Sequence, residues 1–368
     1  MKRPVTALIK PASSLCNMAC SYCFYRDIAD HREQASYGIM NEETTEQLVR
    51  KTLALAEGGP VTYCFQGGEP LIAGIQYYHR FFALVEQYNE KKSPVAYALQ
   101  TNGLLIDEAY CEIFKKHRFL LGVSLDGKSD IHNRYRTTVG GKGTFNRIVQ
   151  NIDLLRRHGI DFNILSVVTR ASARNIRANW NFFRKQGYDY LQFITCLEPI
   201  GCEPFSTGFA MNNEEYYRFH KELFDLYLED NRAGRFVSVR HLDNLMARLQ
   251  GRPAEQCDMQ GRCIGQLVVE ADGSLYPCDF YCEDQYYMGN IRDVDLEKML
   301  ENPAMDRFTQ LSLKVDEACG TCPVYGLCRG GCRRERDYMS DGDLRLNMYC
   351  EGRKKFFTYV LERLRSRR

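Results

Sequence analysis

Three cysteines near the start of the sequence, Cys16, Cys20 and Cys23, are separated by three and then two residues. Thiolates grouped on one loop are ligands for metals and for iron–sulfur clusters. Three such ligands would leave one iron of a cubane [4Fe-4S] cluster open. A zinc site completed by a distant ligand such as His31 is the alternative. Structural zinc sites usually pair their cysteines two by two, so the spacing favours the cluster.

A second group of cysteines occupies the C-terminal half of the chain. Leaving out Cys282, they make two sets of four, the ligand number of two closed [4Fe-4S] clusters. One four-thiolate zinc site in a zinc ribbon is the alternative for the most compact run. The eight cysteines follow C-x5-C-x9-G-x4-C and then C-x2-C-x5-C-x3-C spacings, with one more near the end: Cys257, Cys263, Cys278, Cys319, Cys322, Cys328, Cys332 and Cys350.

The elements that would position these residues alternate between strands and helices. Six apolar runs predict strands, at 5–10, 61–66, 95–100, 119–125, 161–169 and 190–196. Helical spacing of apolar residues lies between them, at 41–57, 75–90, 107–117, 144–158 and 173–186. Such alternation predicts an α/β fold with a parallel sheet, open or curled into a partial barrel. Chemistry in these folds lies on the loops after the strands, where the first cysteines fall.

The pattern changes after a predicted helix at 213–231. From about residue 239 to 350, strand and helix candidates are short, at 267–270 and 296–301, so this segment would need metal centres to stabilise it. A last helix is predicted at 354–365. We therefore expect a first domain at 1–238, a cysteine-rich domain at 239–352 and a C-terminal helix at 353–368.

Charge and hydropathy exclude several classes of protein. The 368 residues contain 49 Lys and Arg against 47 Asp and Glu, a net charge of +2 that gives no reason to expect nucleic-acid binding. No run has the length of a membrane span, and the N-terminus lacks a signal-peptide core. We expect a cytoplasmic protein, in which 16 cysteines would not form a disulfide framework.

The cysteine triplet resembles the signature of radical S-adenosylmethionine (SAM) enzymes. Gln66-Gly67-Gly68-Glu69-Pro70, after the second predicted strand, resembles the motif that holds the SAM ammonium group in that family. Alone, this motif is equally well explained as a turn. The resemblance implies a partial (β/α)6 barrel in which SAM is the cofactor, and in which one electron from the cluster cleaves SAM to a 5′-deoxyadenosyl radical.

The C-terminal cysteines resemble those of the SPASM domain of radical SAM enzymes. This resemblance implies two auxiliary [4Fe-4S] clusters, three clusters in all, with interleaved ligands. Cys257, Cys263, Cys278 and Cys332 would hold the nearer cluster. Cys319, Cys322, Cys328 and Cys350 would hold the farther one.

Further motifs along the whole chain are similar to those of anaerobic sulfatase-maturating enzymes. They are residues 9–14, 37–40, 99–103, 124–127 and 276–281. The resemblance implies oxidation of a sulfatase Cys or Ser to Cα-formylglycine, with Asp279 as the base that removes the side-chain proton. Without it, Asp279 would be a turn residue beside a cluster ligand. Another SPASM peptide maturase, for instance a thioether-forming one, and a zinc-stapled binding module are the alternative functions.

The same resemblance implies the SAM contacts and the partners. The contacts are Tyr22, Gly68, Ser124, Arg136 and Leu197, although the residues alone do not separate Arg136 from Arg134. We expect a monomer that takes a sulfatase polypeptide as substrate and a flavodoxin or ferredoxin as electron donor. Because the cluster loop begins at Cys16, we expect no leader-recognition domain before it. Five cysteines have no assigned role: Cys64, Cys111, Cys196, Cys202 and Cys282.

Overall fold

The computed structural model describes residues 2–365, and these form two compact units. The first contains residues 2–124, 136–162 and 265–308, and the second contains 125–135, 163–264 and 309–365. Residue 1 and residues 366–368, at the ends of the segments expected at 1–238 and 353–368, lie outside the described residues. No helix within 2–365 is long and apolar enough to span a membrane.

Six strands build the sheet of the first unit, in the order β4-β3-β2-β1-β8-β9. All neighbours are parallel except β8 and β9. Alternate side chains such as Ala7, Tyr63 and Leu121 are fully buried, which explains the apolar sequence of these runs. The bounds are β1 (Val5–Ile9), β2 (Val61–Phe65), β3 (Val95–Thr101), β4 (Leu120–Ser124), β8 (Leu267–Val269) and β9 (Leu275–Tyr276).

The register of this sheet brings three loops to one edge. Ile9, the last residue of β1, pairs with Phe65 at the end of β2 and with Val269 at the end of β8. Lys10, Gln66 and Glu270 therefore leave the sheet side by side. Because parallel strands present their carboxyl ends together, this edge is the expected place for a site.

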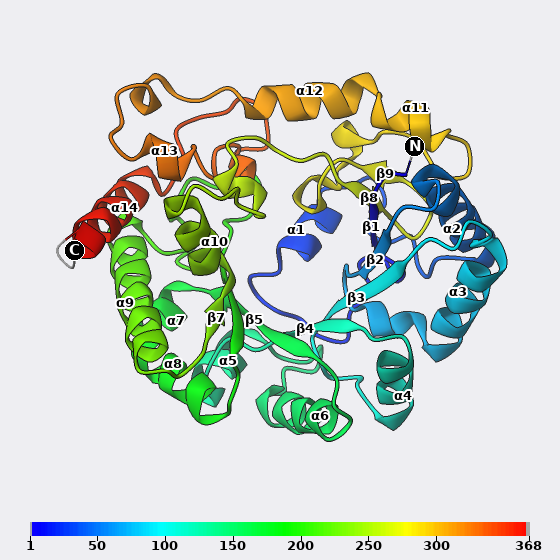
Figure 1. Ribbon diagram of the computed structural model, residues 1–368, viewed down its shortest axis with the longest axis horizontal. Coiled ribbons are helices and arrows are strands. Elements are labelled where there is room, and N and C mark those ends of the chain that lie inside the picture. The colour runs from blue at the N-terminus through cyan, green and yellow to red at the C-terminus, as the bar shows by residue number, and fades with distance from the viewer. Residues whose placement is uncertain (1, 366–368) are drawn as a thin grey trace. The chain divides into compact units, whose positions relative to one another are not determined.

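Helices of the first unit pack against these strands. Figure 1 shows β1, β2 and β3 side by side with α2 and α3 beyond them, and α2 contacts both β1 and β2. Side chains cap two of these helices, since Asn41 accepts from Thr44 N and Asp107 accepts from Tyr110 N. The helices are α1 (Phe24–Asp30), α2 (Glu42–Ala56), α3 (Ile75–Tyr88), α4 (Glu108–Lys116), α6 (Phe145–Arg157) and α11 (Leu296–Leu300).

The second unit has three parallel strands, in the order β7-β6-β5, and several helices. Helix α9 packs along α14, and α10 packs on β6. The strands are β5 (Phe162–Val168), β6 (Tyr190–Thr195) and β7 (Ser238–Val239). The helices are α5 (Ser129–Tyr135), α7 (Arg170–Arg174), α8 (Ile176–Lys185), α9 (Asn213–Arg232), α10 (Arg240–Leu249), α13 (Tyr325–Cys328) and α14 (Cys350–Arg365), and α12 (Pro303–Ser312) is divided between the units.

The expected α/β class with parallel strands is confirmed, and two predicted helices need correction. The helix expected at 173–186 is broken at Asn175, whose backbone leaves the helical region between α7 and α8. The last helix begins at Cys350, four residues earlier than expected. Its first turn therefore contains one of the cysteines that the sequence sets aside as a cluster ligand.

Candidate functional site

The loop that carries the first three cysteines is held against the glycines that follow β2. Gly68 N donates to Ser13 O at 2.8 Å, and Glu69 N donates to Leu15 O at 2.8 Å. A Cβ atom on Gly68 would lie 2.2 Å from Leu15 O, a distance that no side chain tolerates. Glycine at this position thus allows the close approach that places Cys16 at the carboxyl edge of the sheet.

Glu69 joins this loop to the end of β3. Its buried carboxylate accepts from Asn102 N at 2.7 Å, from Thr101 Oγ1 at 2.9 Å and from Leu71 N at 3.1 Å. Burial raises the pKa of Glu69 to about 7. The Asn102 amide donates to Asn17 Oδ1 at 2.7 Å and lies 3.7 Å from Cys16 Sγ. Residues 99–103 stand out as a motif in the sequence, but Asn102 was not predicted as a site residue.

The three thiols lie close enough to influence one another. Burial raises the pKa of Cys16 to about 12, and the charges of Glu69, Cys20 and Cys23 act in the same direction. The Cys16 thiol therefore keeps its proton unless a metal cation replaces it. The donor set therefore fits a sulfur-ligated cluster. Among the described residues, no group of three His, Cys, Asp or Glu side chains is arranged to hold a single metal ion.

Two of the five predicted SAM contacts lie together beside the cysteine loop. The Arg136 guanidinium is 5.4 Å from the centre of the Tyr22 ring, and residues 17–19 pair with residues 137–139. Arg136 is 7% exposed, whereas Arg134 is exposed, so the two arginines that the sequence does not separate differ in burial.

The other three predicted SAM contacts end or follow three different strands, β2, β4 and β6. Gly68 contacts the loop as described above. Ser124 ends β4 in the first unit. Leu197 follows β6 in the second unit, where it is half-buried. The structure therefore places Tyr22 beside Arg136 and Gly68 against the loop at Ser13 and Leu15, and it gives Ser124 and Leu197 only their positions at strand ends.

Asp279, the predicted base, forms an ion pair with Lys10. Lys10 Nζ lies 2.5 Å from Asp279 Oδ1, and the Lys10 side chain is 0% exposed while that of Asp279 is 17% exposed. The ammonium also lies 3.7 Å from the centre of the Tyr25 ring. Burial lowers the pKa of Lys10, but the attraction of the Asp279 and Glu270 carboxylates outweighs it, so the pKa is raised from its ordinary value. Lys10 is therefore a cation, and sequence reasoning did not single it out.

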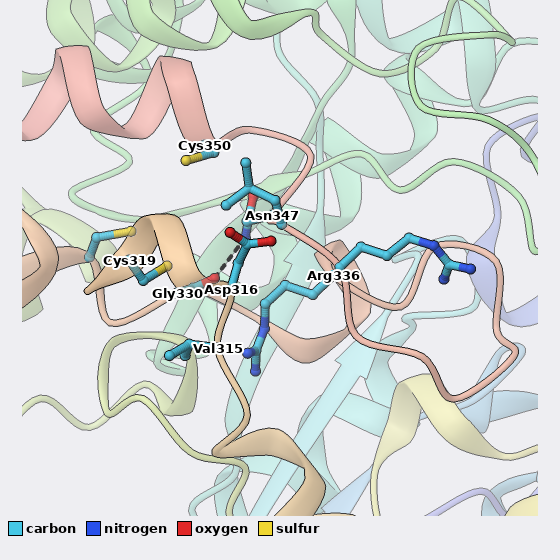
Figure 2. A pocket seen from close by; sticks show the side chains of 10 residues that line it. Val315, Asp316, Cys319, Gly330, Arg336, Asn347 and Cys350 are labelled. Atoms are coloured by element: carbon cyan, nitrogen blue, oxygen red, sulfur yellow. Dashed lines mark hydrogen bonds between the residues drawn. The ribbon is translucent and has the colours of Figure 1, made fainter. Parts of the chain in front are cut away.

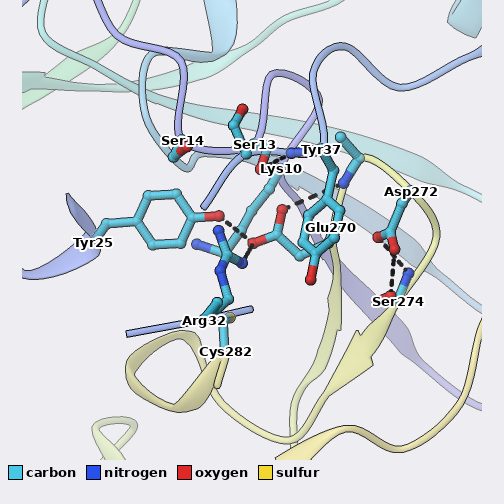
Figure 3. A network of polar contacts seen from close by, with 12 residues as sticks. Lys10, Ser13, Ser14, Tyr25, Arg32, Tyr37, Glu270, Asp272, Ser274 and Cys282 are labelled. Atoms are coloured by element: carbon cyan, nitrogen blue, oxygen red, sulfur yellow. Dashed lines mark hydrogen bonds and ion pairs between the residues drawn. The ribbon is translucent and has the colours of Figure 1, made fainter. Parts of the chain in front are cut away.

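A buried polar network surrounds this pair (Figure 3). The Glu270 carboxylate accepts from Arg32 Nη1 at 2.7 Å and from the Tyr25 hydroxyl. Both side chains of the Arg32–Glu270 ion pair are fully buried. Cys282 is also buried, and burial raises the pKa of its thiol well above the ordinary value. This thiol is therefore neutral, and it is buried near Lys10 and Glu270.

Three cysteines of the second unit line one pocket, and a fourth, Cys322, lies near them. Cys319, Cys328 and Cys350 line it, and Figure 2 shows the Cys319 and Cys350 sulfurs turned toward the same space. Burial raises the pKa of Cys350 to about 11, with further contributions from Cys328, Cys319 and Cys322. These are the four cysteines that the sequence assigns to the farther cluster.

Three further cysteines of the second unit form another group. Burial raises the pKa of Cys332 well above its ordinary value, and the charges of Cys257 and Cys263 act in the same direction. Cys332 thus lies with Cys257 and Cys263, although its nearest cysteine in the sequence is Cys328. Cys278, expected to complete this set, lies in the first unit and immediately precedes Asp279.

Comparisons with known proteins identify relatives of this chain. Residues 11–171 match the radical SAM superfamily, and residues 257–323 match an iron–sulfur cluster-binding domain, SPASM. A cysteine-type anaerobic sulfatase-maturating enzyme of Clostridium perfringens is 41% identical over 98% of this chain and 97% of its own. A serine-type enzyme of Bacteroides thetaiotaomicron is 27% identical over 97% and 90%. The solved structure of native anSMEcpe with bound AdoMet superposes with a TM-score of 0.94, at 41% identity and 99% coverage of both chains.

Proposed function

The chain belongs to the anaerobic sulfatase-maturating enzymes, within the radical SAM superfamily, and we propose that Asp279 is the base with which it oxidises a sulfatase residue to Cα-formylglycine. The family is known for three [4Fe-4S] clusters and bound SAM. The observation that carries the proposal is the ion pair of Asp279 with the fully buried Lys10 at the carboxyl edge of the sheet.

The residues present fit these groups. Cys16, Cys20 and Cys23 would hold the cluster that leaves an iron open for SAM, beside Tyr22, Gly68, Ser124, Arg136 and Leu197. We keep the two auxiliary ligand sets, Cys257, Cys263, Cys278 and Cys332, and Cys319, Cys322, Cys328 and Cys350. When bound, SAM and the three clusters supply the radical that takes one hydrogen from the substrate Cβ and the acceptor for the electron that is released.

Asp279 removes the side-chain proton of the substrate. Lys10 holds Oδ1, and among the described residues Oδ2 has no hydrogen-bond partner, so Oδ2 is the oxygen that receives the proton. An ordinary thiol has a pKa of about 8.5 and an ordinary aspartic acid about 3.9, so the proton moves only as the Cβ–H bond is lost and the thiol becomes more acidic. Water then converts the thioaldehyde to the aldehyde and releases hydrogen sulfide.

A cysteine substrate is favoured by the cysteine-type relatives, which are 40–41% identical, against 27–30% for the serine-type relatives. Native anSMEcpe with bound AdoMet and a Kp18Cys peptide is also similar, with a TM-score of 0.93. We further propose a monomer that receives electrons from a flavodoxin or ferredoxin in the cytoplasm, where reduced thiols are available for cluster assembly.

Incubation of the reduced enzyme and SAM with sulfatase-derived peptides tests the proposal. The cysteine peptide should lose one sulfur and two hydrogens and gain one oxygen, and the matched serine peptide should react more slowly by loss of two hydrogens. Active SAM cleavage beside an unchanged mass of both peptides would contradict the function. A crosslinked peptide that loses only two hydrogens and keeps its sulfur would indicate a thioether-forming maturase.

A further inference from the structure

Arg353 contacts one of the cysteines proposed for the farther auxiliary cluster, Cys328. It lies one turn after Cys350 on α14, and its side chain is 4% exposed. Its Nε donates to Cys328 Sγ at 3.4 Å, and its Nη2 donates to Cys328 O at 3.5 Å. Within the described chain, Cys328 is the one member of this set of four whose sulfur accepts a side-chain hydrogen bond.

The guanidinium is fixed from its other side. Arg353 Nη1 lies 3.4 Å from the Tyr216 hydroxyl and 3.6 Å from Glu335 Oε2. Asn347 Nδ2 donates to the same Glu335 oxygen at 2.8 Å and to Gly330 O at 3.0 Å, the second contact being visible in Figure 2. A rigid fork with charge-assisted contacts on both sides cannot swing away from the sulfur.

Gly331 supplies an independent sign that this contact is built into the fold. Its φ is +74°, and a Cβ atom there would lie 2.5 Å from Asn347 Nδ2 and 3.0 Å from Arg353 Cζ. Any other residue would push the guanidinium or its partner aside. Glycine at position 331 thus leaves the space that the side chains of Asn347 and Arg353 occupy.

We infer that Arg353 is a positioning residue that raises the reduction potential of the farther auxiliary cluster through its hydrogen bond to Cys328 Sγ. A cluster gains negative charge when it is reduced, and a permanent cation with an N–H directed at a ligand sulfur stabilises that charge. The inference rests on the ligand set of the proposed function. Its consequence is that this cluster accepts an electron more readily than its sulfur ligands alone would allow.

Redox titration of the full-length enzyme loaded with its clusters, followed by electron paramagnetic resonance without substrate, tests the inference. Arg353→Gln should lower one of the three midpoint potentials and leave the other two unchanged. Arg353→Lys, which keeps the charge but not the fork, should lower the same potential by less. Arg363→Gln, on the same helix but paired with Asp225, is the matched control and should change none.

Three unchanged midpoint potentials in Arg353→Gln at full iron content would overturn the inference. A rise of the affected potential, or an equal shift of all three potentials, would also overturn it. If Arg353→Gln loses the iron of one cluster, the test uses Arg353→Lys instead. Three unchanged midpoint potentials in Arg353→Lys would then overturn the inference. Because the titration needs no peptide, failure of formylglycine formation would count against the proposed function and leave this result standing.

Discussion

Lys10 and Asp279 form an ion pair at 2.5 Å although 269 residues separate them in the sequence. The pairing follows from the sheet, because Lys10 leaves β1 beside β8, and β9, the antiparallel partner of β8, leads to the loop that contains Asp279. Lys10 has no exposed surface, so water does not screen the attraction as it would for a surface pair. The pair fixes one carboxylate oxygen and leaves the other for the substrate.

Replacement of Lys10 should impair the proton transfer more than the cleavage of SAM. A hydrogen bond to a charged group contributes about 1.5–3 kcal/mol, so Lys10→Met should lower formylglycine formation by about ten- to a hundredfold. Lys10→Arg keeps the charge and should recover much of the loss. The readout is formylglycine per 5′-deoxyadenosine, and an equal ratio in Lys10→Met and the wild type would show that the pair has no part in the reaction.

Gly68→Ala should dislodge the loop that carries Cys16. The new Cβ would meet Leu15 O at 2.2 Å, and overpacking of this kind costs about 1–3 kcal/mol. We expect the variant to bind less iron and to cleave SAM about tenfold more slowly or worse. Gly140→Ala is the control, since its Cβ would find only Thr138 Oγ1 at 3.8 Å. Equal iron and activity in both variants would contradict the proposed role of the close approach.

His241 should make the second unit sensitive to acid. Burial, with a smaller contribution from Arg353, lowers the pKa of His241 from 6.5 to about 4. Between these values the unfolded chain binds a proton that the folded chain does not, so the free energy of unfolding falls as pH falls from 6.5 toward 4. One such group contributes about 2 kcal/mol of this loss at about pH 5.

His241→Leu should therefore lose less stability than the wild type between about pH 7.5 and about pH 5. Denaturant unfolding at the two pH values measures the difference. His220, whose pKa burial also lowers, keeps part of the effect in the variant. His79→Gln alters an exposed histidine and should behave like the wild type. The same loss in His241→Leu and the wild type would contradict the prediction.

Removal of the clusters should loosen residues 313–350 selectively. This segment contains only short helical turns, and burial raises the pKa of the Cys319 and Cys350 thiols, which favours their protonated form when no metal is bound. Metal-stapled segments derive their folding energy from the metal, so chelation should raise their amide hydrogen exchange. Peptides from α2 and α3 serve as the internal control and should keep their protection. Unchanged exchange across 313–350 would show that this segment folds without clusters.

Much of the fold is predictable because local sequence and tertiary position agree. The six predicted strands match β1 to β6 within two residues at each end, since these short apolar runs end at turn residues and bury alternate side chains in the core. Helix α1 escaped prediction because Cys23, which caps it by accepting from Arg26 N, is not a usual capping residue. The break at Asn175 escaped because apolar periodicity continues across it.

The parts of the site that are close in the sequence could also be predicted, and the contacts between distant segments could not. Spacing alone grouped the first three cysteines, since they lie on one loop. The contact of Lys10 with Asp279 and that of Arg353 with Cys328 depend on sheet register and helix packing between distant segments. Nothing in the sequence around Lys10 or Arg353 distinguishes either residue from a surface cation.

The partition between SAM cleavage and peptide oxidation in Asp279→Asn tests the central claim most directly. An amide in place of the carboxylate cannot take the proton, and loss of a general base typically costs about 10²–10⁴-fold. We predict that reduced Asp279→Asn, with SAM and the cysteine peptide, still forms 5′-deoxyadenosine but loses formylglycine by at least about a hundredfold. Formylglycine at the wild-type ratio to 5′-deoxyadenosine would contradict the assignment of Asp279 as the base.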